Sequence, residues 1–257
     1  MIVTNILGTI DRKIQLNECK IKKLDLLVQD IFDFWFVQYD FPNAQGKPYK
    51  SSGGKLVWCN ELNRAIPCDW KYSNLYEIAD FINGLACQKH RPKCCELSLP
   101  VIKIKEMHDG ITEHTERATA NVPEDYIIHS GDILFSWSAT LEVMYWFNTK
   151  GVLNQHIFKV VPKEWYLQDY AYRQISQYIR IFKKIAESRK TTMGHITTDH
   201  LVQSKIVIPP ASVLIEYSKR VSPLLHQIRI ISYQLQKLKN IKQNLLPLLM
   251  NGQVVVQ

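Results

Sequence analysis

A regular three-four spacing of apolar residues runs through the last long segment of the chain. Ten of the eleven positions on this seam are apolar, and the polar one is Lys242. The seam consists of Leu214, Tyr217, Val221, Leu224, Ile228, Ile231, Leu235, Leu238, Lys242, Leu245 and Leu249. A seam held for about five heptads predicts a helix that packs lengthwise along another helix. The alternative is an ordinary amphipathic helix on a globular core, which seldom keeps so strict a spacing.

The first segment of the chain repeats this pattern and supplies a partner. Its seam consists of Leu7, Ile10, Ile14, Asn17, Ile21, Leu24, Val28, Ile31 and Trp35. Adding 214 to these numbers gives the C-terminal seam from Val221 to Leu249, so the two ends form a weak internal repeat around an insert. We therefore predict helices over residues 2–38 and 211–250 that pack antiparallel as a coiled-coil spacer. The apolar residues expected at their interface are Leu7, Ile10, Ile14, Ile21, Leu24, Val28, Ile31, Leu224, Ile228, Ile231, Leu235, Leu238 and Leu245.

Both predicted helices carry signals near the insert. Aromatic residues crowd the end of the first helix, where Phe32, Phe34, Trp35 and Phe36 are expected to anchor it in a core. In the second helix, Ser222-Pro223 suits a restart or a kink, because serine is a common N-cap and proline is tolerated in the first helical turn.

The insert has a different sequence pattern. From about Pro67 to about Ile208, short β-branched and aromatic runs alternate with turn dipeptides such as Asp109-Gly110. One helical stretch, at about 167–186, interrupts them. The sequence thus predicts an α+β protein in which a mixed α/β domain lies between two long helices. Its expected divisions are 1–54 (helix and linker), 55–210 (globular domain) and 211–257 (second helix).

Charge and cysteine content narrow the class of protein. The net charge of +8 and the pI of about 9.1 favour an anionic partner, most often nucleic acid or a membrane surface. The six cysteines form no CxxC pair and no regular framework, so we expect reduced thiols in a cytoplasmic protein. Cys87, His90, Cys94 and Cys95 lie close together in sequence but match no common zinc spacing, and no metal site is predicted.

Motifs for catalysis are missing from the sequence. It contains no GxGxxG, GxxxxGK[ST], GxSxG or HExxH motif, and no Asn-Pro-Pro-Tyr motif typical of amino-group DNA methylation. His156 or His195 could act as a general base, but neither has an obvious nucleophile or carboxylate partner. We therefore predict no catalytic residue, with a stand-alone enzyme that uses one of these histidines as an alternative.

Several short motifs follow one another along nearly the whole chain. The first segment contains Ile10–Asn17, Phe34–Val37, Asp40–Pro42 and Gly46–Gly54. The insert contains Trp70, Leu75, Ile78 and Gly84, then Gly131–Ser138, Leu153–Phe158, Thr191–Thr198 and Ile208–Pro210, and Leu245–Gly252 follows near the end. In this order they resemble the central conserved region, one recognition domain and the distal conserved region of type I restriction–modification specificity (S) subunits. The order makes this resemblance specific.

The resemblance implies a half-length S subunit, because family members usually carry two recognition domains and this chain carries one. Such a chain is expected to bind double-stranded DNA, to read one half-site and to position methyltransferase (M) and restriction (R) subunits. It is expected to be non-catalytic and to hold no cofactor, since S-adenosylmethionine, ATP and Mg²⁺ would belong to the partner subunits. Two copies could pair about a twofold axis, which predicts a homodimer and an interrupted palindromic target.

Candidate DNA contacts are polar, basic or planar residues between the predicted strands. Arg189 and Lys190 suit phosphates, whereas Asn154 and Gln155 suit adenine edges. The full set is Lys103, Lys105, Ser136, Ser138, Asn154, Gln155, His156, Arg189, Lys190, Thr191, Thr192 and His195. The alternative function is a coiled-coil adaptor that binds protein and not DNA.

Overall fold

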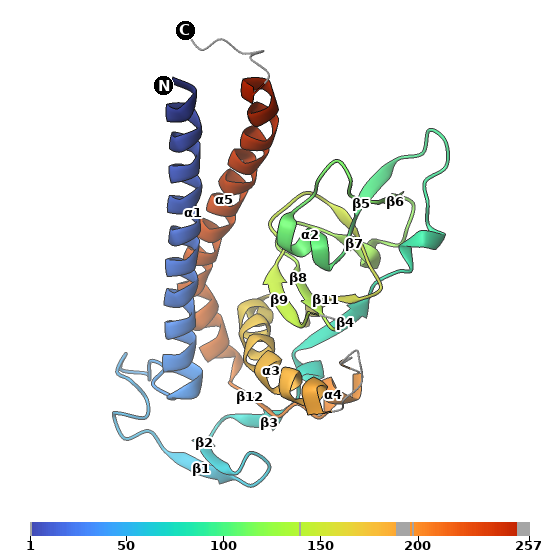
Figure 1. Ribbon diagram of the computed structural model, residues 1–257. Helices are drawn as coiled ribbons and strands as arrows, with labels where there is room; N and C mark the ends of the chain where they lie inside the picture. The colour runs from blue at the N-terminus through green and yellow to red at the C-terminus, as the bar shows by residue number, and fades with distance from the viewer. Residues whose placement is uncertain (1, 139, 189–195, 197, 251–257) are drawn as a thin grey trace. The chain divides into compact units, whose positions relative to one another are not determined.

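The computed structural model describes residues 2–138, 140–188, 196 and 198–250 (Figure 1). The chain forms two compact units, one of Met1–Asp30 with Val221–Gln257 and one of Ile31–Arg220. We call these the helical unit and the globular unit. Within the residues described, no helix is both long enough and apolar enough to cross a membrane.

Two long helices, α1 (Ile2–Phe32) and α5 (Ala211–Met250), confirm the helices predicted from the seams. The last turn of the first one differs from the prediction, because Asp33–Val37 form a π-helical turn. Of the restart or kink expected at Ser222-Pro223, the restart is wrong, since α5 continues through Pro223 without a break. A proline inside a helix removes one backbone hydrogen bond, a cost that packing of the flanking turns can offset.

In the helical unit, α1 and α5 run antiparallel (Figure 1). Lys242 Nζ lies 2.6 Å from Asp11 Oδ1, and Lys239 Nζ lies 3.0 Å from Glu18 Oε1, so higher numbers on one helix pair with lower numbers on the other. All predicted interface residues are buried or half-buried. The polar seam residue Asn17 is also buried, and its Nδ2 has no hydrogen-bond partner among the described residues.

Among its described residues the globular unit contains four small sheets, which confirms the predicted mixed α/β architecture. Two of them are two-stranded antiparallel pairs, β1 (Leu56–Cys59) with β2 (Arg64–Pro67) and β3 (Lys71–Ser73) with β12 (Ile206–Ile208). An antiparallel sheet has the order β4 (Ala79–Asn83), β11 (Ile157–Pro162), β8 (Ile133–Ser136) and β9 (Glu142–Tyr145). A mixed sheet has the order β6 (Arg117–Thr119), β5 (Ser98–Ile102), β10 (Gly151–Leu153) and β7 (Ile127–Ile128), with β5 and β10 parallel.

Helices and 3-10 turns connect these strands. They are α2 (Ile104–Asp109), α3 (Gln168–Ser188) and α4 (Thr198–Val202), with 3-10 turns η2 (Leu75–Glu77), η3 (Cys87–Lys89), η4 (Glu124–Tyr126) and η5 (Trp165–Leu167). One apolar cluster takes Ile102 from the mixed sheet, Leu134 from the antiparallel sheet and Met107 from α2. The two four-stranded sheets therefore share one hydrophobic core.

A second core forms where the end of α1 meets α3 and the start of α5. The ring of Phe36 lies 4.9 Å from that of Tyr170 and 4.8 Å from that of Tyr217, and all three rings are buried. Phe32, Trp35 and Phe36 thus anchor the helix end in a core, as predicted, whereas the prediction is wrong for Phe34, which is 40% exposed. Because of this anchoring, the globular unit begins at Ile31 and ends at Arg220, whereas the predicted divisions stand at 54/55 and 210/211.

Candidate nucleic-acid interface

The ends of three strands meet at one edge of the globular unit. Leu85 forms a parallel bridge with Asn154, and its N–H donates to Leu153 O at 2.9 Å. In return, Gln155 N–H donates to Leu85 O at 2.8 Å. The approach is close at Gly84, where a Cβ atom would lie 2.2 Å from Asn154 O. Only glycine fits this contact without a backbone shift, so Gly84 permits the segment after β4 to lie against the turn before β11.

At this edge Asn83, Trp137, Gln155 and His156 form what we call the rim cluster. Trp137 Nε1–H donates to Asn83 Oδ1 at 3.0 Å, and Trp137 N–H donates to His156 O at 3.3 Å. The indole and imidazole ring centroids are 5.7 Å apart. Gln155 Nε2 lies 3.3 Å from His156 Nε2. Asn83 and His156 are exposed, while Trp137 and Gln155 are half-buried. The cluster thus has a fixed base and an exposed polar surface.

The chemistry of the rim cluster suits recognition of base edges. Amide side chains can form paired hydrogen bonds to adenine, and donors of this kind also reach the acceptors of guanine and thymine. Because Asn83 Oδ1 already accepts the indole N–H, the amide NH₂ group of Asn83 is left to donate outward. The His156 ring contacts Trp137 and Gln155, and none of the hydrogen bonds of the described residues joins it to a carboxylate or a nucleophile.

Three of the residues predicted to contact DNA are buried. Ser136 is fully buried, and its hydroxyl donates to Thr140 O and to Ser138 O. Ser138 is also buried. Asn154 is 3% exposed, and its Oδ1 accepts the N–H of His156 at 3.4 Å. The side chains of Ser136 and Asn154 thus hold the turns behind the rim cluster. Because all three side chains are buried, the predicted DNA contacts at Ser136, Ser138 and Asn154 do not fit this structure. Gln155 and His156 keep theirs as a prediction.

Lys103 and Lys105 follow β5, next to the same edge. Asn154 N–H donates to Ile102 O at 3.3 Å, which places the Lys103 backbone beside the turn. Lys103 is in ion-pair contact with Glu116, and both side chains are partly exposed. Lys105, in the first turn of α2, is exposed. Of the two lysines, Lys105 is therefore the better placed to contact a phosphate.

The remaining predicted contacts, Arg189, Lys190, Thr191, Thr192 and His195, lie outside the described residues. Ile196, which follows them, is buried and donates its N–H to Trp137 O at 3.1 Å.

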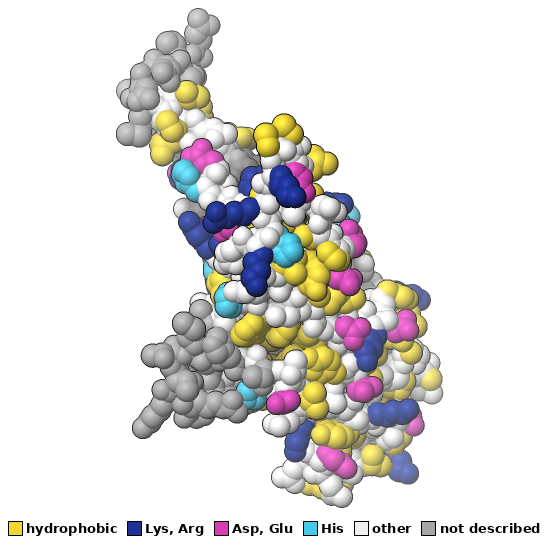
Figure 2. All heavy atoms as spheres, turned by 90° about the vertical axis from the view of Figure 1, so that its right-hand side faces the viewer, with side chains coloured by type: hydrophobic (Ala, Val, Ile, Leu, Met, Phe, Trp, Pro, Cys, Tyr) yellow, Lys and Arg dark blue, Asp and Glu magenta, His cyan; other side chains and the backbone are white. Residues whose placement is uncertain are grey.

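Figure 2 shows that Lys and Arg side chains on the face it presents are dispersed among Asp and Glu. On that face the positive net charge is not gathered into one patch.

Two partners in the rim cluster could not be assigned from the sequence. Asn83 is the last residue of β4 and precedes Gly84, and a polar residue before glycine at a strand end is only a weak signal of a turn. Its contact with Trp137 depends on β11, which pairs with β4 through Phe158 and Asn83 and with β8 through Ile157 and Ser136. Pairing between strands distant in sequence brings the two side chains together.

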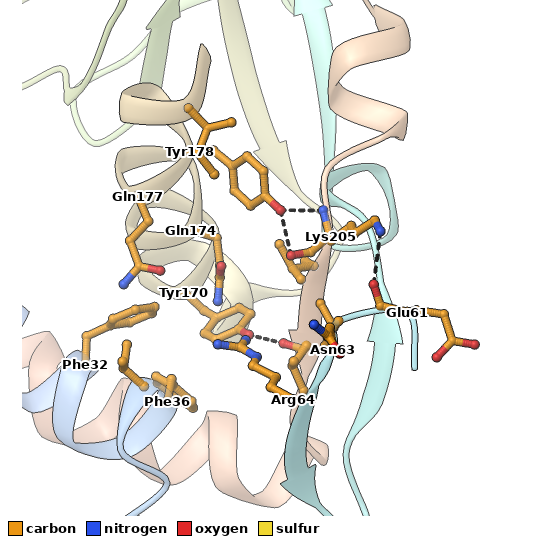
Figure 3. A pocket seen from close by; sticks show the side chains of 15 residues that line it. Phe32, Phe36, Glu61, Asn63, Arg64, Tyr170, Gln174, Gln177, Tyr178 and Lys205 are labelled. Carbon is orange, nitrogen blue, oxygen red and sulfur yellow. Dashed lines mark hydrogen bonds between the residues drawn. The ribbon is translucent and has the colours of Figure 1, made fainter. Parts of the chain in front are cut away.

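A pocket of about 470 Å³ lies elsewhere in the globular unit, between α3, the β1–β2 turn and the end of α1 (Figure 3). Its polar lining residues include Arg64, Gln174 and Lys205, and its aromatic ones include Phe32 and Tyr170. Lys205 Nζ donates to Glu61 O at 3.0 Å. The residues that line it include no His, Cys or Ser, and Glu61 is the one carboxylate among them. Nor does any group of three or more His, Cys, Asp or Glu in the described part of the chain have the arrangement of a metal site.

Comparison with known proteins defines the class. Residues 67–240 match the family described as the type I restriction modification DNA specificity domain, and the chain belongs to this family. It is 21% identical over 98% of its length to the type I restriction enzyme HindI specificity subunit of Haemophilus influenzae. It is also 21% identical over 99% of its length to the MjaIX specificity subunit of Methanocaldococcus jannaschii. The chain spans 66% and 58% of these two relatives.

A solved structure supports the fold. The crystal structure of a type I restriction–modification S subunit from M. genitalium matches 95% of this chain and 58% of its own, with a TM-score of 0.57 and 13% sequence identity. The predicted resemblance to type I specificity subunits is therefore confirmed.

Proposed function

We propose that this chain is the DNA-recognition subunit of a type I restriction–modification assembly and reads one half of a bipartite duplex target. The observation that carries the proposal is the family match over residues 67–240, since it includes most of the globular unit and the rim cluster. The relatives are named specificity subunits of restriction enzymes. In this role the chain performs no catalysis, and M and R subunits supply S-adenosylmethionine, ATP and Mg²⁺ chemistry.

The helical unit serves as a coiled-coil spacer in this proposal. Support comes from the buried and half-buried seams and from the two ion pairs between α1 and α5. A buried asparagine on such a seam favours one register and one number of helices, at a cost in stability. Asn17 has this position, and its Nδ2 lacks a partner within the described chain. Two chains that pair through these helices would present two recognition units and read two identical half-sites in opposite directions.

A selection experiment tests DNA recognition. The purified chain, alone and together with an M subunit from the same organism, is mixed with duplexes of random sequence, and bound DNA is sequenced. We expect enrichment of one short motif. Binding should weaken steeply as salt rises, because phosphate contacts release counterions. Binding of partner proteins without enrichment of any motif would favour the adaptor function instead.

Substitution in the rim cluster tests its role. A lost base contact costs about 1–3 kcal/mol, so Asn83→Ala and His156→Ala should each weaken specific binding by roughly 5- to 150-fold. Binding to unrelated DNA should change much less, because phosphates dominate it. Asn60→Ala, at the exposed β1–β2 turn, is the matched control and should leave both affinities unchanged. Equal loss for specific and unrelated DNA would assign the cluster to backbone contact.

The dimer is tested separately. Light scattering gives the mass of the chain in solution, and mapping of methylated adenine or cytosine in cells gives the target. Two identical half-sites in opposite orientation are expected. An asymmetric target would mean that another S chain supplies the second recognition unit.

A further inference from the structure

The loop between η3 and β5 places two thiols in contact. Cys94 and Cys95 are consecutive and exposed, and their Sγ atoms are 3.6 Å apart. All six cysteines of the chain lie within the described residues. Cys59 and Cys87 are buried, while Cys19 and Cys68 are exposed. Among these described cysteines, Cys94 and Cys95 are the pair whose sulfur atoms are in contact.

The backbone of a tight turn holds the two thiols. Glu96 N–H donates to Lys93 O at 3.1 Å, which closes the turn with Cys94 and Cys95 at its centre. The Glu96 carboxylate accepts the N–H of Lys93 at 2.9 Å and the hydroxyl of Thr119. Cys95 has a φ of 63°, in the left-handed region that residues with a side chain rarely adopt. Each end of the turn is thus fixed, and the two side chains are kept together.

We propose that Cys94 and Cys95 form a reversible thiol-oxidation site that reacts with peroxide. The thiol of one cysteine loses its proton, and the resulting thiolate sulfur attacks an oxygen of hydrogen peroxide. The O–O bond breaks, a sulfenic acid forms, and the leaving hydroxide takes up the proton that the thiol released and becomes the first water. The thiol of the other cysteine then attacks the sulfenic sulfur, which forms the S–S bond and releases a second water. In total, two thiols lose two electrons and two protons, and one peroxide is reduced to two waters.

Geometry favours a short-lived sulfenic acid and an easily reduced product. An exposed cysteine beside a resolving cysteine is the usual arrangement of a redox-sensitive thiol. The Cα atoms of consecutive residues are about 3.8 Å apart across a trans peptide, less than the roughly 4.4–6.8 Å usual for disulfides. Closure therefore strains the turn, and strained, exposed disulfides are the ones that thiols reduce readily.

Peptide mass measurement on the full chain tests the proposal. The reduced protein is treated with a small excess of hydrogen peroxide, blocked with N-ethylmaleimide and digested with trypsin, which releases residues 94–103 as one peptide. We expect this peptide to be lighter by two hydrogen atoms and to carry no maleimide. Treatment with dithiothreitol before blocking should restore two maleimide adducts.

Variants separate the resolving step from general reactivity. In Cys94→Ser, the sulfenic acid on Cys95 has no neighbour to resolve it and should be trapped by dimedone. Cys68→Ser removes an exposed cysteine elsewhere and should leave oxidation of the 94–103 peptide unchanged. Oxidised sulfur without an internal S–S bond in the unsubstituted chain would overturn the proposal. A disulfide from Cys94 or Cys95 to another cysteine or to a second chain would do so too.

Discussion

Removing one hydroxyl from the aromatic core should destabilise the globular unit measurably. Tyr217 is fully buried, and its hydroxyl donates to Asp169 Oδ2. Asp169 is 4% exposed and also accepts the hydroxyl of Tyr145 at 3.3 Å, and its Oδ1 lies 3.7 Å from Arg173 Nε. The substitution Tyr217→Phe keeps the ring against Phe36 but leaves this carboxylate with one donor fewer.

The expected loss follows from the kind of bond removed. A hydrogen bond to a charged group contributes about 1.5–3 kcal/mol, and truncation of a buried ring, which would cost about 3–5 kcal/mol, is avoided. For a unit of this size, 1 kcal/mol shifts the Tm by about 2–4 °C, so Tyr217→Phe should lower the Tm by about 3–12 °C.

Urea unfolding and thermal melting measure this change. Tyr233→Phe, the same substitution at a 56% exposed position of α5, is the control and should change the free energy of unfolding by less than about 0.5 kcal/mol. In an Asp169→Asn background, the effect of Tyr217→Phe should shrink, because the acceptor is no longer charged. A loss below about 0.5 kcal/mol for Tyr217→Phe, or an equal loss in both backgrounds, would refute the assigned bond.

Three further changes test other parts of the structure. Gly84→Ala should lower the free energy of unfolding by about 1–3 kcal/mol and weaken DNA binding, because its Cβ would meet Asn154 O. Its control, Gly8→Ala, has nothing within 4 Å of the new Cβ and should stabilise α1 by about 0.5–1 kcal/mol; melting curves measure stability and mobility shifts measure binding. Hydrogen bonds from the side chain and the N–H of Ser51 lower the pKa of Asp40 below its ordinary 3.8, so this carboxylate stabilises the fold above that pH, and the contribution is lost as pH falls through the lowered pKa. Ser51→Ala should therefore reduce the loss of stability in acid, and unfolding curves with an unchanged pH profile would contradict this. Lys242→Ala should change the free energy of unfolding by less than about 1 kcal/mol, and by less still at high salt, because Lys242 and its ion-pair partner Asp11 are both partly exposed. A loss of several kcal/mol in urea unfolding would contradict this prediction.

The long helices could be predicted because their information is local. Apolar residues at regular spacing from Leu7 to Ile31 mark a helix without knowledge of what it contacts. The π-helical turn at Asp33–Val37 could not be predicted in this way, since it depends on packing that buries the consecutive residues Trp35 and Phe36. Local sequence at Pro223 does not distinguish a restart from a kinked but continuous helix, and α5 continues there because packing can offset one lost backbone bond.

Less of the candidate site than of the long helices could be predicted from the sequence. Polar residues between two predicted strands are good candidates for contact, and two of them, Gln155 and His156, lie in the rim cluster. The same pattern predicts contact by Ser136, which is buried, because a strand-end hydroxyl can bond backbone as readily as solvent. Asn83 joins the cluster through strand pairing over more than fifty residues of chain, which one sequence does not encode in any local pattern.

The globular unit is one unbroken stretch, Ile31–Arg220, whereas the helical unit is assembled from the two flanking segments. At the level of the gene, this layout makes the globular unit a cassette. Two crossovers, one in the coding sequence of each long helix, would exchange the whole unit and leave both flanking segments in place. Because both junctions lie inside α1 and α5, an incoming cassette must begin with a helix end and finish with a helix start at matching helical phase. Recombination within these two short segments would then place a new recognition unit on unchanged flanking helices.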